Sequence, residues 1–209
     1  MADKSDTQHT YLTIDHEAEG RFTEKMSRFL SFALSVADSA QAKEKIKLLA
    51  NRYHDARHVC WAYMVGPQRQ NYLLTDNGEP SGTAGKPILG QINSRRLTNV
   101  AVVVVRYFGG IKLGTPGLIA AYREAASIAL DNAGTKEITR TRIIDLTVPY
   151  AELDKAMRII KDQNLNILSQ QMSLDCRLSV EAPLNIYDDI TKRFEKITQL
   201  KFNSSDGLQ

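Results

Sequence analysis

The sequence has little cysteine, no long apolar run and almost no excess of charge. Its 209 residues include only two cysteines, Cys60 and Cys176, which excludes a disulfide-dense small fold and favours a reducing compartment, the cytoplasm. No apolar run approaches the roughly 18 residues that a membrane helix needs, and the first ten residues contain no apolar signal core. We therefore expect a cytoplasmic globular protein that makes no membrane contact.

The small positive charge becomes informative when it is located along the chain. The 27 Lys and Arg against 24 Asp and Glu give a formal net charge of +3. Residues 52–112 hold eight of these cations and only three acids, whereas residues 141–209 hold nine cations and ten acids. This excess predicts a phosphate-attracting face in the first part of the chain. The alternative, eight solvated cations spread around the domain, stays open.

The pattern of the chain predicts an α+β protein with two domains, residues 1–140 and 141–209. In the first, Asp38 to Gln41 fits a helix N-cap followed by Gln at the third helical position. Residues 100–107 are apolar on both strand faces up to Arg106, which indicates a strand covered on both sides. The predicted strands are 11–18, 22–36, 57–65, 70–75 and 100–107, and the predicted helices are 42–53, a short one from about Pro87, and 115–132.

The second domain is predicted to be ferredoxin-like, because its order is β-α-β-β-α-β. Leu153, Met157 and Ile160 recur at helical spacing, as do Ile186, Ile190 and Phe194. The expected strands are 141–148, 165–171, 174–181 and 199–202, around helices 150–162 and 184–197.

A glycine- and proline-rich loop at residues 76–87 is the first candidate binding loop. It is not a Walker A motif, because Pro80 and Pro87 stand where that motif needs Gly and Ser or Thr. A looser anion nest remains, and the alternative is a tight turn that meets backbone geometry only. The candidate ligands are Ser81, Thr83, Lys86 and backbone N–H groups near Gly82 and Gly85.

A second glycine loop follows the buried strand and leads into a helix. Thr115 as N-cap and Pro116 at the first position predict that helix start. Free N–H groups and the helix dipole favour an anion there, and ligand crevices in α/β sheets open at strand carboxyl ends. The alternative is that the glycines serve only close packing. The candidate phosphate ligands are Arg106, Lys112, Gly109, Gly110 and Gly114.

The sequence leaves a catalytic alternative open between the two loops. A hydrolase or other small-molecule enzyme could use Asp76, Glu79, Ser81 and His58, with Glu79 or His58 as base. The competing interpretation is that Asp76 and Glu79 bond loop N–H groups or pair with Arg57 or Arg106. We expect no metal, because the spacing of His54 and His58 spans a helix end, and we expect no cofactor. The aromatic residues Trp61, Tyr63 and Tyr107 could stack on RNA bases or pack in the core.

The two loops carry a resemblance to the YigZ/IMPACT family. The run Asp76–Leu89, followed by Val103–Tyr122, resembles both family signatures in order, and Ala56–Tyr63 resembles a third segment. The resemblance implies an N-terminal α/β domain like the second domain of ribosomal small-subunit protein five, followed by a ferredoxin-like domain. It also implies a role in translation: eukaryotic members are regarded as regulators acting through a stress-responsive kinase pathway. The C-terminal domain of bacterial members is thought to bind nucleic acid or ribosomes. Ala120 departs from the family, which often has Arg or Lys there.

Together these features predict a non-enzymatic binding protein that modulates translation. The expected partner is RNA or the ribosome, with a translation-related protein as a further expected partner. The hydrolase and a protein-interaction module that uses the C-terminal sheet remain as alternatives.

Overall fold

A computed structural model describes residues 9–205, so the ends of the two predicted domains lie outside the described residues. The described chain divides into two compact units: Tyr11–Ile138, and residues 139–205 together with residues 9 and 10. The first is called the N-terminal unit and the second the C-terminal unit. The elements up to the division are β1 (Thr10–Thr13), β2 (Ala18–Glu24), β3 (Ser27–Ser35), α1 (Ser39–Arg52), β4 (His58–Val65), β5 (Asn71–Thr75), α2 (Gly85–Ser94), β6 (Val100–Tyr107), α3 (Gly114–Ala133) and β7 (Lys136–Thr139).

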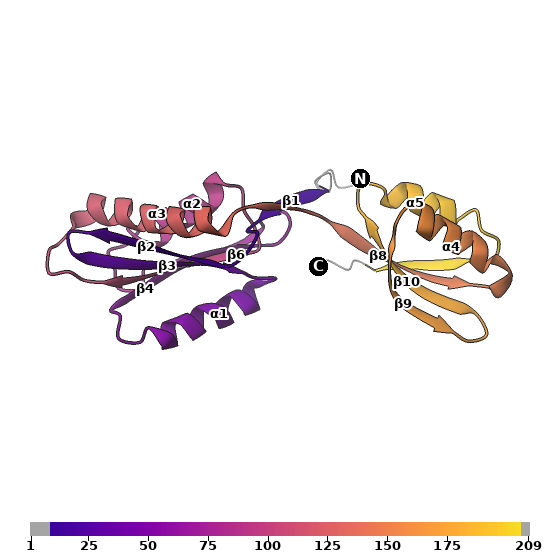
Figure 1. The fold of residues 1–209 in the computed structure, drawn as a ribbon, viewed down its shortest axis with the longest axis horizontal. Helices are drawn as coiled ribbons and strands as arrows, with labels where there is room; N and C mark the ends of the chain where they lie inside the picture. The colour runs from indigo at the N-terminus through magenta and orange to yellow at the C-terminus, as the bar shows by residue number, and fades with distance from the viewer. Residues whose placement is uncertain (1–8, 206–209) are drawn as a thin grey trace. The chain divides into compact units, whose positions relative to one another are not determined.

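The N-terminal unit is built on a sheet of order β2-β3-β6-β4-β5 in which every neighbouring pair is antiparallel. β6 is the central strand, and its side chains alternate between two cores. Val100, Val102 and Val104 pack in the core with α2 and α3, whereas Val103 and Val105 pack with α1 on the other face. Figure 1 shows the helices on the two faces of this sheet. The prediction that this strand is covered on both sides is confirmed.

The start of the chain differs from the two predicted strands over 11–18 and 22–36. The structure has three strands there, and β2 and β3 form a hairpin whose turn is Lys25–Met26. Both turn residues have positive φ, 44° and 64°. Such turns usually use Asn-Gly or Asp-Gly, so Lys-Met gives no sequence signal for the turn. The predicted cap of α1 is confirmed, since Asp38 accepts hydrogen bonds from the backbone N–H groups of Ala40 and Gln41.

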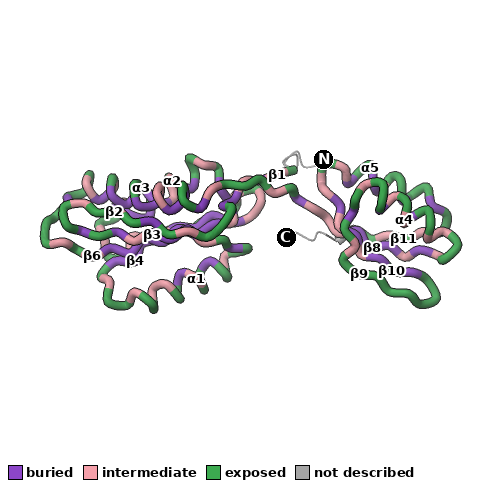
Figure 2. The backbone as a smooth tube through the Cα atoms, in the orientation of Figure 1, coloured by how far each residue is buried: buried purple, intermediate pink, exposed green. Residues whose placement is uncertain are grey.

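The C-terminal unit has the predicted order β-α-β-β-α-β. Its sheet has the order β11-β8-β10-β9, and α4 and α5 pack against it through Ala156, Ile160, Ile190 and Phe194. Buried residues alternate with more exposed ones along β8 and β10, while β9 is mostly exposed (Figure 2). The elements are β8 (Thr141–Val148), a 3-10 turn (Tyr150–Glu152), α4 (Leu153–Asp162), β9 (Asn166–Met172), β10 (Cys176–Pro183), α5 (Tyr187–Phe194) and β11 (Lys201–Ser205).

The helices and the cysteines bear on two expectations from the sequence: the absence of a membrane helix and the absence of a disulfide framework. Among residues 9–205, no helix is both long enough and apolar enough to cross a membrane. Cys60 and Cys176 are both free thiols and both buried, each in the core of a different unit.

Candidate phosphate-binding cavity

The two glycine loops meet because β4 and β6 are antiparallel neighbours. His58, at the start of β4, is in register with Arg106 near the end of β6. The loop after β5 returns to the same edge, where the carbonyl of Asn77 lies 3.1 Å from His58 Nδ1. The sequence analysis placed the site by the rule that ligand crevices open at the carboxyl ends of parallel strands. That rule does not apply here, because the sheet is antiparallel. Strand register brings the loops together instead.

A buried ion pair lies beneath this junction. Arg106 Nη1 donates to Glu79 Oε1 at 2.7 Å, and only 6% and 4% of the two side chains are exposed. Tyr122 Oη, from α3, donates to the same Glu79 oxygen at 2.9 Å. Ser27 Oγ accepts a longer bond of 3.4 Å from Arg106 Nη2. The pairing of Glu79 with Arg106, one of the two interpretations of this acid, is therefore the one observed.

Two neutral groups extend the buried network. Cys60 Sγ lies 3.3 Å from Tyr122 Oη and 2.9 Å from the carbonyl oxygen of Asp76. Burial raises the pKa of the Cys60 thiol to about 12, and burial likewise raises the pKa of Tyr122. Both groups therefore stay protonated at neutral pH. Cys60 is a core thiol here and lacks the lowered pKa that a reactive thiolate requires.

The predicted anion nest in the first loop is occupied by the chain itself. Asp76 accepts three backbone N–H groups, from Gly82 at 2.7 Å, Ala84 at 2.9 Å and Gly85 at 2.8 Å. Partial burial alone would raise the pKa of Asp76, but these three bonds and the nearby Lys86 hold that pKa below its ordinary value. A carboxylate thus fills the place that the sequence argument left for an external anion.

A cavity of about 380 Å³ opens between the loops, above the ion pair. Its volume lies within the range of small-molecule and cofactor sites. Arg57 and Lys112 are exposed cations on its wall, and neither has an ion-pair partner within 4.0 Å among the described residues. The first residues of α3 contribute their helix N-terminus to the same wall. The lining residues are Arg57, His58, Glu79, Pro80, Arg106, Phe108, Lys112, Leu113, Gly114, Thr115 and Leu118.

The helix that reaches the cavity begins earlier than predicted. α3 starts at Gly114, and Leu113 precedes it as the cap residue without a side-chain cap bond. Thr115 therefore lies inside the helix instead of capping it. The positive φ of Gly114, 70°, is a backbone conformation that favours glycine and that turns the chain into the helix.

The structure unites some predicted site residues and separates others. His58, Glu79, Arg106, Lys112 and Gly114 line the one cavity. The hydroxyl of Thr83 donates to the Pro80 carbonyl, and the N–H of Gly109 donates to Ser27 Oγ. These two predicted phosphate ligands therefore already donate to groups of the protein. Ser81 and Gly110 are exposed but do not line the cavity.

Lys86 lies apart from the cavity. It lines a separate recess of about 410 Å³ beside α2 and α3, with Arg123 on the α3 side. Lys86 was a predicted phosphate ligand of the first loop, and it does not share a cavity with Arg106 and Lys112, the predicted ligands of the second. Ala120, the departure from the family pattern, is an exposed residue of α3 that lines neither recess.

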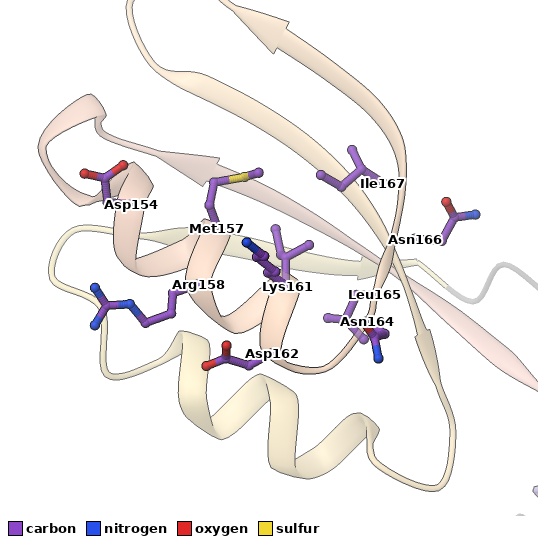
Figure 3. A pocket seen from close by; sticks show the side chains of 10 residues that line it. Asp154, Met157, Arg158, Lys161, Asp162, Asn164, Leu165, Asn166 and Ile167 are labelled. Carbon is purple, nitrogen blue, oxygen red and sulfur yellow. The ribbon is translucent and has the colours of Figure 1, made fainter.

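A larger recess, of about 880 Å³, lies in the C-terminal unit. Side chains of α4 and of the turn into β9 surround it (Figure 3). Its charged residues are two acids, Asp154 and Asp162, and two bases, Arg158 and Lys161. These charges cancel, so this recess has no excess charge with which to attract an anion.

The structure offers no cluster for a metal among its described residues, and the aromatic residues considered for stacking on RNA make contacts within the protein. Among residues 9–205, no group of three His, Cys, Asp or Glu side chains could hold a metal ion. The rings of Trp61 and Tyr63 stack on each other with centroids 5.9 Å apart, and the Tyr107 hydroxyl donates to Asp55 at 2.9 Å. The aromatic residue on the cavity wall is Phe108, which was not considered from the sequence. Its position directly after the buried strand was the available signal.

Fold and site together define a class: a two-unit α+β protein with a cationic cavity at one edge of an antiparallel sheet. The chain belongs to the IMPACT family, since the Impact N-terminal domain family matches residues 25–130. It is 38% identical over 147 residues to "IMPACT family member YvyE" of Bacillus subtilis, covering 70% of this chain and 68% of the relative. It is 37% identical over 131 residues to "IMPACT family member YigZ" of Escherichia coli, covering 62% and 64%.

The fold also matches a solved structure along nearly the whole chain. A protein described as "Crystal structure of an hypothetical protein" superposes with a TM-score of 0.72 at 27% sequence identity. The match covers 96% of this chain and 99% of the other. The names of the two bacterial relatives state family membership and no activity.

Proposed function

We propose that this chain is an RNA-binding protein that modulates translation and that it contacts RNA phosphate in the cavity between its glycine loops. The observation that carries the proposal is the cavity wall, where Arg57 and Lys112 are exposed and have no ion-pair partner within residues 9–205. They stand beside the N-terminus of α3, whose dipole adds a partial positive charge. Three positive features thus converge on one concave place.

The buried ion pair supports this use of the cavity. Glu79 compensates the charge of Arg106, so Arg106 lines the cavity without adding net positive charge. Arg57 and Lys112 supply the uncompensated charge. Arg106 Nε is buried and has no hydrogen-bond partner among the described residues, so it is not counted among the groups that would meet phosphate.

The proposed role in translation draws on fold and family. We assign the N-terminal unit to the fold of the second domain of ribosomal small-subunit protein five and the C-terminal unit to the ferredoxin-like fold, as two separate domains. Domains of both kinds occur in translation factors, so ribosomal RNA is the first candidate ligand and the cytoplasm the expected site of action. Because many functions share one fold, the contact with phosphate is argued from the cavity, and only the link to translation is argued from fold and family.

We propose no reaction at this site. Asp76 is held by three N–H groups, and Glu79 accepts from both Arg106 and Tyr122 on one oxygen. Ser81, the candidate nucleophile, does not line the cavity. A hydrolase needs a base within hydrogen-bond reach of its nucleophile, and both carboxylates are engaged by other groups of the chain.

The test is the binding of labelled single-stranded RNA by the full chain at a series of salt concentrations. We expect the logarithm of the affinity to fall linearly with the logarithm of salt, because phosphate contacts release counterions. Lys112→Ala should weaken binding, whereas Lys47→Ala, which removes an exposed cation of α1, should not. Absence of binding at low salt, or binding without a salt slope, would overturn the proposal.

A further inference from the structure

Exposed apolar side chains lie on the two loops beside the cavity, and one of them, Phe108, lines it. Met26, Phe108 and Ile111 are 72%, 52% and 49% exposed, which is unusual for three large apolar residues on two adjoining loops. The loops adjoin because Gly109 lies directly against the β2–β3 turn, where a Cβ atom on Gly109 would come within 2.0 Å of the Met26 carbonyl carbon. The hydrogen bond from Gly109 N–H to Ser27 Oγ, 3.2 Å, fixes this contact.

Phe108 is both anchored and accessible. The Arg106 guanidinium carbon lies 5.6 Å from the centre of the Phe108 ring and 5.6 Å from the centre of the buried Phe29 ring. Arg106 is itself fixed by Glu79, so the Phe108 ring rests on a rigid support. About half of Phe108 nevertheless stays exposed, and it lines the cavity next to Lys112. A ring held in this way loses little conformational freedom when a ligand stacks on it.

We propose that Phe108 is a stacking residue for a nucleobase whose adjoining phosphate binds Lys112 and Arg57. This inference rests on the proposed function and adds which part of the RNA is recognised. A flat aromatic base that a ribose links to an anionic phosphate matches a wall that places an aromatic face beside cations with no ion-pair partner among the described residues. The ligand is single-stranded, because a base inside a duplex is stacked on its neighbours and has no free face.

The experiment separates the base from the phosphate. Affinity is measured for a labelled twelve-nucleotide oligouridylate, for an abasic ribose-phosphate oligomer of the same length, and for a duplex RNA. Phe108→Leu keeps an apolar side chain but removes the ring. It should weaken oligouridylate binding by about five- to 150-fold, the range for loss of one stacked base, and leave abasic binding unchanged. Wild type should prefer oligouridylate over the duplex.

Two variants control for loss of the loop itself. Phe108→Tyr keeps a ring and should restore oligouridylate binding, and Ile111→Ala removes an exposed apolar residue of the same loop that does not line the cavity. Thermal unfolding of all variants is compared with wild type to check that the loop stays folded.

Two outcomes would overturn the inference but not the proposed function. In one, Phe108→Leu binds oligouridylate as wild type does. In the other, it loses oligouridylate and abasic binding equally. If wild type binds neither oligomer at low salt, the proposed function itself fails, so the two failures are distinguishable.

Discussion

At the scale of single residues, Glu79 ties the first loop to the central strand and to α3. It accepts hydrogen bonds from Arg106 and Tyr122 while almost fully buried. Glu79→Ala leaves the Arg106 charge buried without its partner and should lower the free energy of unfolding by about 3 kcal/mol. Urea denaturation measures the loss, with Glu44→Ala on the exposed side of α1 as control.

The pair should also be replaceable as a unit. In the double variant Glu79→Leu with Arg106→Met no charge is left buried alone, so its unfolding free energy should lie closer to wild type than that of Glu79→Ala. A double variant that is less stable than the single one would contradict the view that the unpaired charge causes the loss.

Asp76 gives the molecule a pH-dependent contribution to stability. Because its pKa is lower in the folded chain than the ordinary 3.8, the carboxylate stabilises the fold above that value. The contribution is lost as pH falls through the folded-state pKa. Asp76→Asn should therefore be less stable than wild type at pH 7, and the difference should shrink below about pH 4. Urea denaturation at several pH values checks this, and a difference that grows on acidification would contradict it.

Cys60 should be chemically silent in the native protein. It is buried, and burial raises its pKa to about 12, so almost no thiolate exists at pH 8. In the Cys176→Ser variant, which leaves Cys60 as the remaining thiol, a thiol reagent should react slowly in buffer and rapidly in denaturant. Equal rates in the two conditions would show that the network around Tyr122 opens readily.

At the scale of elements, the sequence predicted the features that depend on hydrophobic periodicity and on helix-capping residues. The buried strand β6 and the cap of α1 followed from apolar runs and an Asp with Gln three residues later. The hairpin turn at Lys25–Met26 was missed, because its residues lack the usual Asn-Gly or Asp-Gly signal. The antiparallel sheet was missed because strand direction depends on non-local pairing. For the same reason, the sequence left two roles open for Arg106, phosphate contact and pairing with Glu79, and the structure shows the pairing.

The contact between the second loop and the β2–β3 turn depends on one glycine. Gly109→Ala would place a Cβ atom 2.0 Å from the Met26 carbonyl carbon, so the two loops must separate. We expect lower stability and weaker RNA binding. Gly90→Ala is the matched control, because its Cβ atom meets nothing within 4 Å and α2 should gain up to about 1 kcal/mol in helix propensity. Calorimetric unfolding and RNA titration of both variants measure the contrast, and a Gly109→Ala protein as stable as wild type would contradict the contact.

At the scale of the whole molecule, the net charge differs between the two units. The excess of cations falls in residues 52–112, and the two cations without ion-pair partners on the cavity wall come from that segment. The C-terminal unit carries slightly more acids than bases, and the charges around its recess of about 880 Å³ cancel. This distribution argues that the N-terminal unit makes the main phosphate contact, although the family resemblance points to the C-terminal domain.

This distribution of charge also predicts which cations determine the salt dependence of RNA binding. The double variant Arg57→Ala with Lys112→Ala should reduce the slope of log affinity against log salt by about 1.4, since each phosphate contact with a single strand contributes about 0.7. The matched variant, Lys192→Ala with Lys196→Ala, removes two exposed cations from the C-terminal unit and changes the net charge equally. Its slope should equal that of wild type. Because both variants lower the total charge by two, a difference between them reports position alone. Equal slopes for the two double variants would mean that RNA senses only the overall charge, and a loss confined to the Lys192 and Lys196 variant would move the phosphate contact to the C-terminal unit.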